Sequence, residues 1–281
     1  MPTAVERALA QYIDASLKLD GIDGIDTQAG FINSAGKIDA EFLKLALPET
    51  VDLSHKYQSQ FAPQFAAIGD AFVQLGGNFT GIADFGLVAE AFIPTASRDT
   101  GPNSDFLGLD ATLRTDGADL AVFGHGFVAL DTVADGAGFR TAVGQLGDGS
   151  VLKLSTDMTA SAAAFETLGT DLVKLGGNAD TNKTPLDAAY RKLGATLENI
   201  SSEFTTLSTD FGGLGADMRA FGGANSVTSG VKASSVVTNA SFGADLLKLD
   251  HAFLALDSGF SQIGAPLATI LLNELSLSTP T

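Results

Sequence analysis

Aspartates and three histidines are the residues of this sequence best suited to chemistry, because cysteine is absent. Asp20, Asp23 and Asp26 stand three apart in DGIDGID, and carboxylates are ligands that Ca²⁺ prefers. The stretch lacks the Asp-x-Asp-x-Asp-Gly order and the distal glutamate of an EF-hand loop. It also differs from the nine-residue glycine-aspartate repeat of calcium β-rolls. We therefore expect a turn between helices here, with a calcium site as the alternative.

The histidines are His55, His125 and His251, and they form no HExxH or HxH pattern, so no zinc motif is present. His125 lies in FGHGF, between two apolar positions, and His251 follows Leu-Asp on the flank of the last apolar run. We expect these side chains to face solvent or to cap a helix. A haem or metal ligand is the alternative for each, because a partner distant in sequence is not visible.

A Gly-Gly-Asn sequence ends an apolar run twice, in AFVQLGGN (71–78) and in DLVKLGGN (171–178). A phosphate-binding loop would need a strand before the glycines and a helix after them. The spacing before residue 176 is helical, which predicts a helix C-terminus with one left-handed glycine. After residue 77, Phe79 and Ile82 continue the apolar spacing, which predicts a close contact or a flexible point within a helix. No Gly-x-Ser-x-Gly or Walker sequence occurs, so we predict no catalytic or cofactor-binding residue and no enzyme.

The elements that position these residues are predicted by apolar spacings that alternate between three and four. This average period of 3.5 residues is that of the a/d seam of a coiled coil. A period of two, which would indicate strands, is not sustained anywhere in the sequence. The two complete runs are Tyr190, Leu193, Leu197, Ile200, Phe204, Leu207, Phe211, Leu214, Met218, Phe221 and Phe242, Leu246, Leu249, Phe253, Leu256, Phe260, Ile263, Leu267, Ile270. Two other runs are each interrupted by one polar residue, Asp116 between Phe106 and Leu130 and Ser161 between Leu154 and Leu175.

The spacing predicts an all-α fold: an elongated bundle of long antiparallel helices with coiled-coil-like packing rich in Gly, Phe and Leu. Thr184-Pro185-Leu186-Asp187 has the cap, the proline and the acid of a helix start, and Gly222-Gly223 marks its end. Gly147–Ser150 has the composition of a turn or loop. We expect short N-terminal helices over residues 1–50 and one continuous long-helix domain over 51–281.

A unit of Leu or Phe, a small residue, any residue and Asp recurs within the heptads, at 154–157, 168–171, 207–210, 214–217 and 242–245. In heptad letters the small residue is e and the Asp is g. A small e residue lets a neighbouring backbone approach closely, whereas the g aspartates have no basic e stripe to meet. Successive g residues lie about 10.5 Å apart, too far to share one ion. The predicted packing and assembly residues are Gly169, Gly194, Gly215, Phe204, Phe211, Phe253 and Phe260.

Composition narrows the classes of partner. Acids outnumber bases 33 to 16, which argues against nucleic acid, and no apolar run is long enough to span a membrane. The N-terminus has no signal-peptide pattern. The acidic, glycine-rich, cysteine-free chain resembles bacterial proteins that are exported in one step through an uncleaved C-terminal signal, and the tail LATILLNELSLSTPT is compatible with one. We expect an extracellular or cell-surface location by this route, or otherwise a cytoplasmic one.

These features together predict a non-enzymatic structural protein without a cofactor. Its expected partner is itself, because seam-dense helices with small packing residues favour self-association into a filament, sheath or surface layer. The alternative is a protein that binds a hydrophobic surface, such as a granule or neutral lipid, or an α-helical pore-forming protein that inserts residues 79–93.

Overall fold

The computed structural model describes residues 62–82, 102–130, 136–177, 184–223 and 239–277, and these contain helices and no strand. The expected all-α class is confirmed. The helices are α5 (Ala62–Ile82), α7 (Pro102–Leu130), α8 (Gly136–Leu146), η4 (Gly147–Val151), α9 (Leu152–Leu175), α10 (Pro185–Gly223), α11 (Asn239–Ser261) and α12 (Gly264–Leu277). The short helices expected over residues 1–50 lie outside the described residues.

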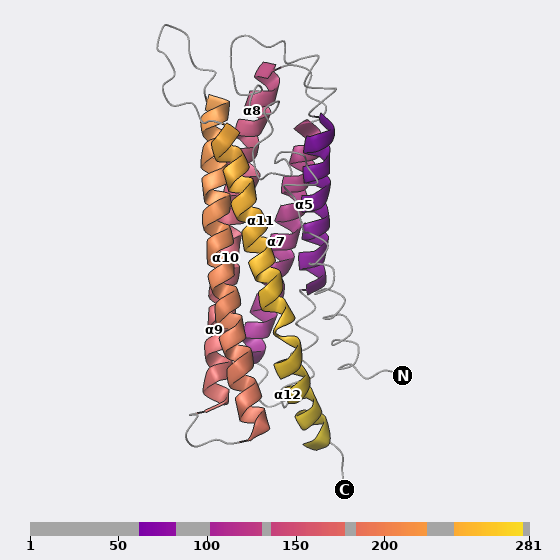
Figure 1. The fold of residues 1–281 in the computed structure, drawn as a ribbon, viewed down its shortest axis with the longest axis vertical. Coiled ribbons are helices and arrows are strands. Elements are labelled where there is room, and N and C mark those ends of the chain that lie inside the picture. The colour runs from indigo at the N-terminus through magenta and orange to yellow at the C-terminus, as the bar shows by residue number, and fades with distance from the viewer. Residues whose placement is uncertain (1–61, 83–101, 131–135, 178–183, 224–238, 278–281) are drawn as a thin grey trace.

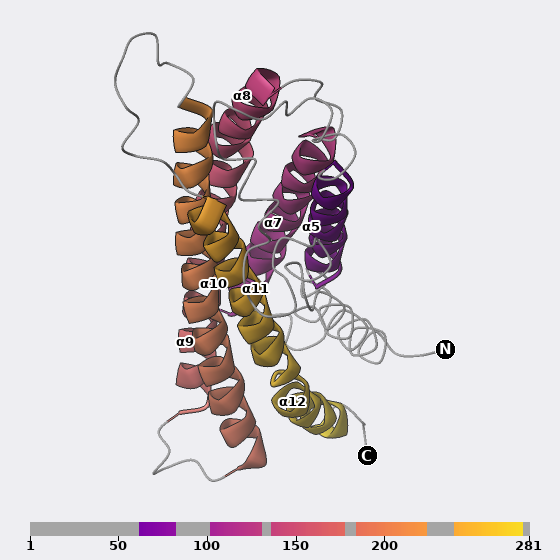
Figure 2. The ribbon, with the colours of Figure 1, turned by 45° about the horizontal axis from the view of Figure 1, so that its top comes forward.

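Two helix pairs dominate the packing. Figure 1 shows α9 beside α10 along the long axis and α5 beside α7, and these pairs make the most extensive contacts among the described helices. Helix α11 packs on α10, and α7 packs on α9. In Figure 2, α12 bends away from the direction of α11 toward the C-terminus. The 39 residues of α10 span roughly 58 Å at 1.5 Å per residue, so this helix extends along most of the molecule.

Small residues at heptad position e bring α9 and α10 together. The facing pairs are Ser155 with Ser208, Ala162 with Ser201, and Gly169 with Gly194. Ser155 and Ser208 each donate a hydrogen bond from Oγ to the other's carbonyl oxygen, over 2.8 and 2.6 Å. Residue numbers rise along one helix as they fall along the other, so the two helices run in opposite directions.

Helices α5 and α7 use the same device with glycine on both sides. A Cβ atom on Gly69 would lie 2.5 Å from the carbonyl oxygen of Gly124, and one on Gly117 would lie 2.6 Å from that of Gly76. Real Cβ atoms do not approach this closely, so only glycine permits this backbone contact. The Gly76 result confirms the close contact expected at the first Gly-Gly-Asn sequence, inside an uninterrupted helix.

A chain of phenylalanine rings runs through the core between these helices. Neighbouring ring centroids lie 4.8 to 6.3 Å apart, a range in which edge-to-face packing is favourable. The chain links Phe127, Phe123, Phe72, Phe211, Phe253, Phe79, Phe204, Phe165 and Phe260. It therefore joins α5, α7, α9, α10 and α11 into one core.

The turn expected at Gly147–Ser150 is wrong. Residues Gly147–Val151 form a π-helical turn, η4, and the chain continues through it as helix from α8 into α9. The buried positions Val143, Gly147, Val151 and Leu154 are separated by four, four and three residues. A regular seam that ends in the same step would be separated by three, four and three, so this segment contains one extra residue. A π turn accommodates one extra residue without breaking the helix, which explains how a Gly-Asp-Gly-Ser sequence is retained inside it.

Helix ends follow local chemistry. The expected start of α10 is confirmed, because the backbone N–H of Asp187 donates to Oγ1 of Thr184 at 3.2 Å and Pro185 is the first helical residue. Gly177 has a φ of 61°, as expected for the end of α9 at the second Gly-Gly-Asn. The last apolar run divides into α11 and α12, and Pro266 lies in the first turn of α12, where its missing N–H needs no partner within the helix.

Candidate functional site

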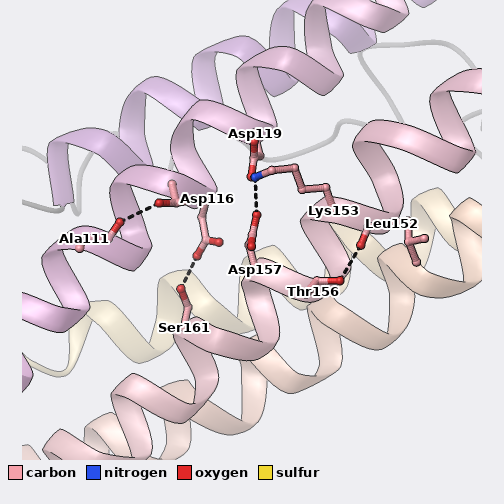
Figure 3. A network of polar contacts seen from close by, with 9 residues as sticks. Ala111, Asp116, Asp119, Leu152, Lys153, Thr156, Asp157 and Ser161 are labelled. Atoms are coloured by element: carbon pink, nitrogen blue, oxygen red, sulfur yellow. Dashed lines mark hydrogen bonds and ion pairs between the residues drawn. The ribbon is translucent and has the colours of Figure 1, made fainter.

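The two polar interruptions of the heptad seams lie against each other. Asp116 of α7 and Ser161 of α9 are both fully buried. Oγ of Ser161 donates a hydrogen bond to Oδ2 of Asp116 over 2.5 Å (Figure 3). In the sequence each residue is an isolated exception in an apolar run, whereas in the fold they form one buried polar pair.

The ionised form of Asp116 has few groups around it that would stabilise its negative charge. Its second carboxylate oxygen, Oδ1, has no hydrogen-bond partner among the described residues. Burial raises the pKa of Asp116 from 3.8 to about 7; the Ser161 hydrogen bond opposes this rise, the nearby charges of Asp157 and Asp119 add to it, and Lys153 opposes it. The carboxyl group therefore exchanges its proton near neutral pH.

One turn from this pair, a lysine bridges two further carboxylates at the same interface. Nζ of Lys153 donates to Asp119 of α7 and, at 2.7 Å, to Asp157 of its own helix (Figure 3). Burial and the neighbouring Asp157 carboxylate raise the pKa of Asp119 despite Lys153. Burial acts to raise the pKa of Asp157 as well, but hydrogen bonds with Asp119 and Lys153 hold it below its ordinary value. One lysine is thus shared by two acids.

The same arrangement of two aspartates and a lysine occurs twice more. The groups are Asp105 with Asp171 and Lys174, and Asp245 with Asp217 and Lys248. Burial, followed by the neighbouring Asp171 carboxylate, raises the pKa of Asp105. Burial also raises the pKa of Asp245, with Lys248 opposing and Asp217 adding to the effect. The g aspartates of one helix therefore face aspartates of the next helix, a pairing that the sequence did not predict.

The predicted packing residues all lie inside the bundle. The side chains of Phe204, Phe211, Phe253 and Phe260 are buried members of the ring chain. Gly169 and Gly194 face each other across α9 and α10. Gly215 lies against η4, where a Cβ atom would be 3.1 Å from Cγ1 of Val151. These seven residues thus hold helices of one chain together.

The residues suggested for metal binding do not assemble into a site within the described part of the chain. His125 and His251 are exposed on α7 and α11, in agreement with the expected solvent-facing role. His55 and the calcium alternative at Asp20, Asp23 and Asp26 lie outside the described residues. Over the described ranges, no group of three or more His, Asp or Glu side chains is placed to hold a metal ion.

Proton binding is the chemistry that this site supports. A catalytic acid must reach the atom that it protonates, and Asp116 is fully buried against Ser161. Comparison of the chain with protein-family models, with curated proteins and with solved structures found no match. Among the helices described, none is long and apolar enough to cross a membrane.

Proposed function

We propose that this chain is a structural, non-enzymatic protein, an elongated antiparallel bundle with coiled-coil-like packing that self-associates into a filament, sheath or surface layer. The observation that carries the proposal is the use of the repeat unit. Each e residue and each paired g aspartate described above lies at a contact between helices, and these contacts are spread along the bundle rather than gathered in one place. A repeat of this kind supports a long scaffold more readily than a reaction centre.

Contacts between copies must use the outer helix faces, because the described seams are occupied within one chain. Leu107 and Val122 are both more than half exposed on α7, and Leu254 is 43% exposed on α11. Burying such side chains against another copy contributes about 25 cal/mol per Å² of apolar surface. These outer positions are therefore where we place the contact.

The experiment is to measure the mass of the purified full-length chain by light scattering and to image it by negative-stain microscopy. We expect concentration-dependent assembly of the wild type. The double variant Leu107→Glu/Val122→Glu should stay monomeric, whereas the matched variant Ala195→Glu/Ser202→Glu, on exposed positions of α10, should assemble. Both variants should unfold at the wild-type denaturant concentration. A wild type that is strictly monomeric at high concentration contradicts the proposal.

The same exposed leucine and valine side chains favour a second candidate, binding to a neutral hydrophobic surface such as a granule or lipid. This candidate predicts co-sedimentation of the wild type with neutral hydrophobic particles and loss of co-sedimentation in Leu107→Glu/Val122→Glu. Pore formation would add dye release from neutral liposomes. Absence of co-sedimentation would eliminate the surface-binding candidate, and absence of dye release would eliminate the pore.

A further inference from the structure

A single buried carboxyl group interrupts the apolar contact between α7 and α9. Asp116 occupies a seam position that is otherwise taken by Leu or Phe, and its environment provides one hydroxyl donor and leaves Oδ1 without a partner. A protonated carboxyl group carries no charge, so a single hydrogen bond from Ser161 leaves it with a much smaller cost of burial than a carboxylate would have. An ionised one needs water or a cation, and a buried charge without either is strongly unfavourable.

We propose that Asp116 is a built-in proton switch, whose ionisation opens the contact between α7 and α9 and whose protonation closes it. The switch goes beyond self-association, because it acts within one chain and is testable on a monomer. Opening would admit water to Oδ1 and separate the two helices at this turn, while the small-residue contacts continue to hold α7 to α5 and α9 to α10.

The charged groups near Asp116 make its ionisation harder. Asp119 on the same helix and Asp157 on α9 place negative charge beside it, and Lys153, the nearest cation, is already shared between those two acids. Burial with these charges brings the pKa of Asp116 to about 7. The interface therefore changes its protonation near neutrality rather than at acid pH.

The other elements packed against α7 contribute no charge close to Asp116. The only ionisable residue of α5 is Asp70, beside the contact of Gly69 with Gly124, about two turns from Asp116. Helix α8 contacts α7 at Gly126, about three turns away. In η4, Asp148 pairs with Arg219 of α10 at 3.6 Å.

The direct test measures the separation of α7 and α9 as the pH changes. The cysteine-free chain allows a unique pair of spin labels at the exposed positions Ala118 and Ala160, one on each helix. Between pH 6 and pH 8 we expect the label-to-label distance distribution of the wild type to shift to longer distances. Asp116→Asn keeps the shape and the acceptor for Ser161 but has no proton to lose, so its distribution should not change.

Two further variants distinguish the switch from general charge repulsion. Asp110→Asn also removes one acid from α7 but leaves Asp116 in place, so it should still open as the wild type does. Ser161→Ala removes the hydrogen bond that favours the ionised carboxylate, so its opening should move to higher pH. Identical distributions for the wild type and Asp116→Asn at both pH values would overturn the proposal, as would opening in Asp116→Asn.

Discussion

Burial changes the chemistry of individual carboxyl groups in this bundle, and Asp116 is the extreme example. A rise in its pKa from 3.8 to about 7 corresponds to a pH-dependent contribution of about 4 kcal/mol to the free energy of unfolding, at about 1.4 kcal/mol per pKa unit. The folded chain binds this proton more tightly than the unfolded chain does. The stabilisation by this bound proton is therefore complete below about pH 4 and is lost as the pH rises to about 7. Above about pH 7, Asp116 causes little further change in stability.

Glycines of one helix give opposite predictions according to what they face. Gly108 of α7 has open space where a Cβ would be added, whereas a Cβ on Gly124 would lie 2.8 Å from the backbone nitrogen of Val73 in α5. Gly108→Ala should stabilise the chain by about 0.5–1 kcal/mol through helix propensity. Gly124→Ala should destabilise it by about 1–3 kcal/mol through overpacking. Urea unfolding of both variants measures the difference, and equal effects would refute the close-approach role of Gly124.

Sequence patterns marked Asp116 and Ser161 as exceptions in apolar runs but predicted neither a site at these residues nor their pairing. The heptad spacing singled out Asp116 and Ser161 as polar positions in apolar seams, and the structure buries both. Their pairing depends on which helices are neighbours and on the register between them. Neither is encoded within a single amphipathic helix, because a seam defines a face and leaves the identity of the facing helix open.

At the scale of elements, periodicity predicted most of the described helices, and its failures have local causes. The ends of α9 and α10 follow from glycine and capping chemistry that can be read directly. The turn expected at Gly147–Ser150 came from its composition, yet packing against α10 overrides that preference: a Cβ on Gly147 would lie 2.9 Å from the carbonyl oxygen of Gly215. The π turn is therefore stabilised by a tertiary contact that the local sequence does not reveal.

Deleting Gly149 tests the role of the π turn. Because the π turn accommodates one extra residue, its removal should restore a regular α-helix and leave Val143 on the core face, so the unfolding free energy should change little. Deleting the exposed Ala160 from the regular helix α9 is the matched comparison, because one missing residue there rotates the preceding part of the helix by about 100° and turns Leu154 out of the core. That deletion should cost about 2 kcal/mol or more in unfolding free energy. Thermal unfolding followed by circular dichroism compares the two deletions, and an equally large loss for the deletion of Gly149 would contradict the role of the π turn.

At the scale of the whole molecule, charge opposes the proposed self-association. The formal net charge of −17 makes copies repel one another at neutral pH, while the apolar residues on the outer faces attract. The acidic composition could be read from the sequence. The placement of aspartates against aspartates inside one chain could not, since it requires the helix neighbours to be known.

Salt should therefore promote assembly. Raising NaCl from 0.1 M to 1 M shortens the screening length from about 10 Å to about 3 Å and weakens repulsion between copies. We expect the average mass in light scattering to rise with salt for the wild type and to stay constant for Leu107→Glu/Val122→Glu. A mass that falls as salt is added would indicate that ion pairs, rather than apolar contacts, join the copies.

The register of the small-residue contacts between α9 and α10 allows the length of this hairpin to change only in steps of whole heptads. Facing residues such as Ser155 with Ser208 and Gly169 with Gly194 have the same sum of residue numbers, so each heptad step along one helix is matched by one on the other. Removing or adding seven residues in both helices preserves the register of these small-residue contacts and changes the length of the hairpin by about 10.5 Å. Variants of this hairpin that keep its packing should therefore differ in length by multiples of seven residues in each helix.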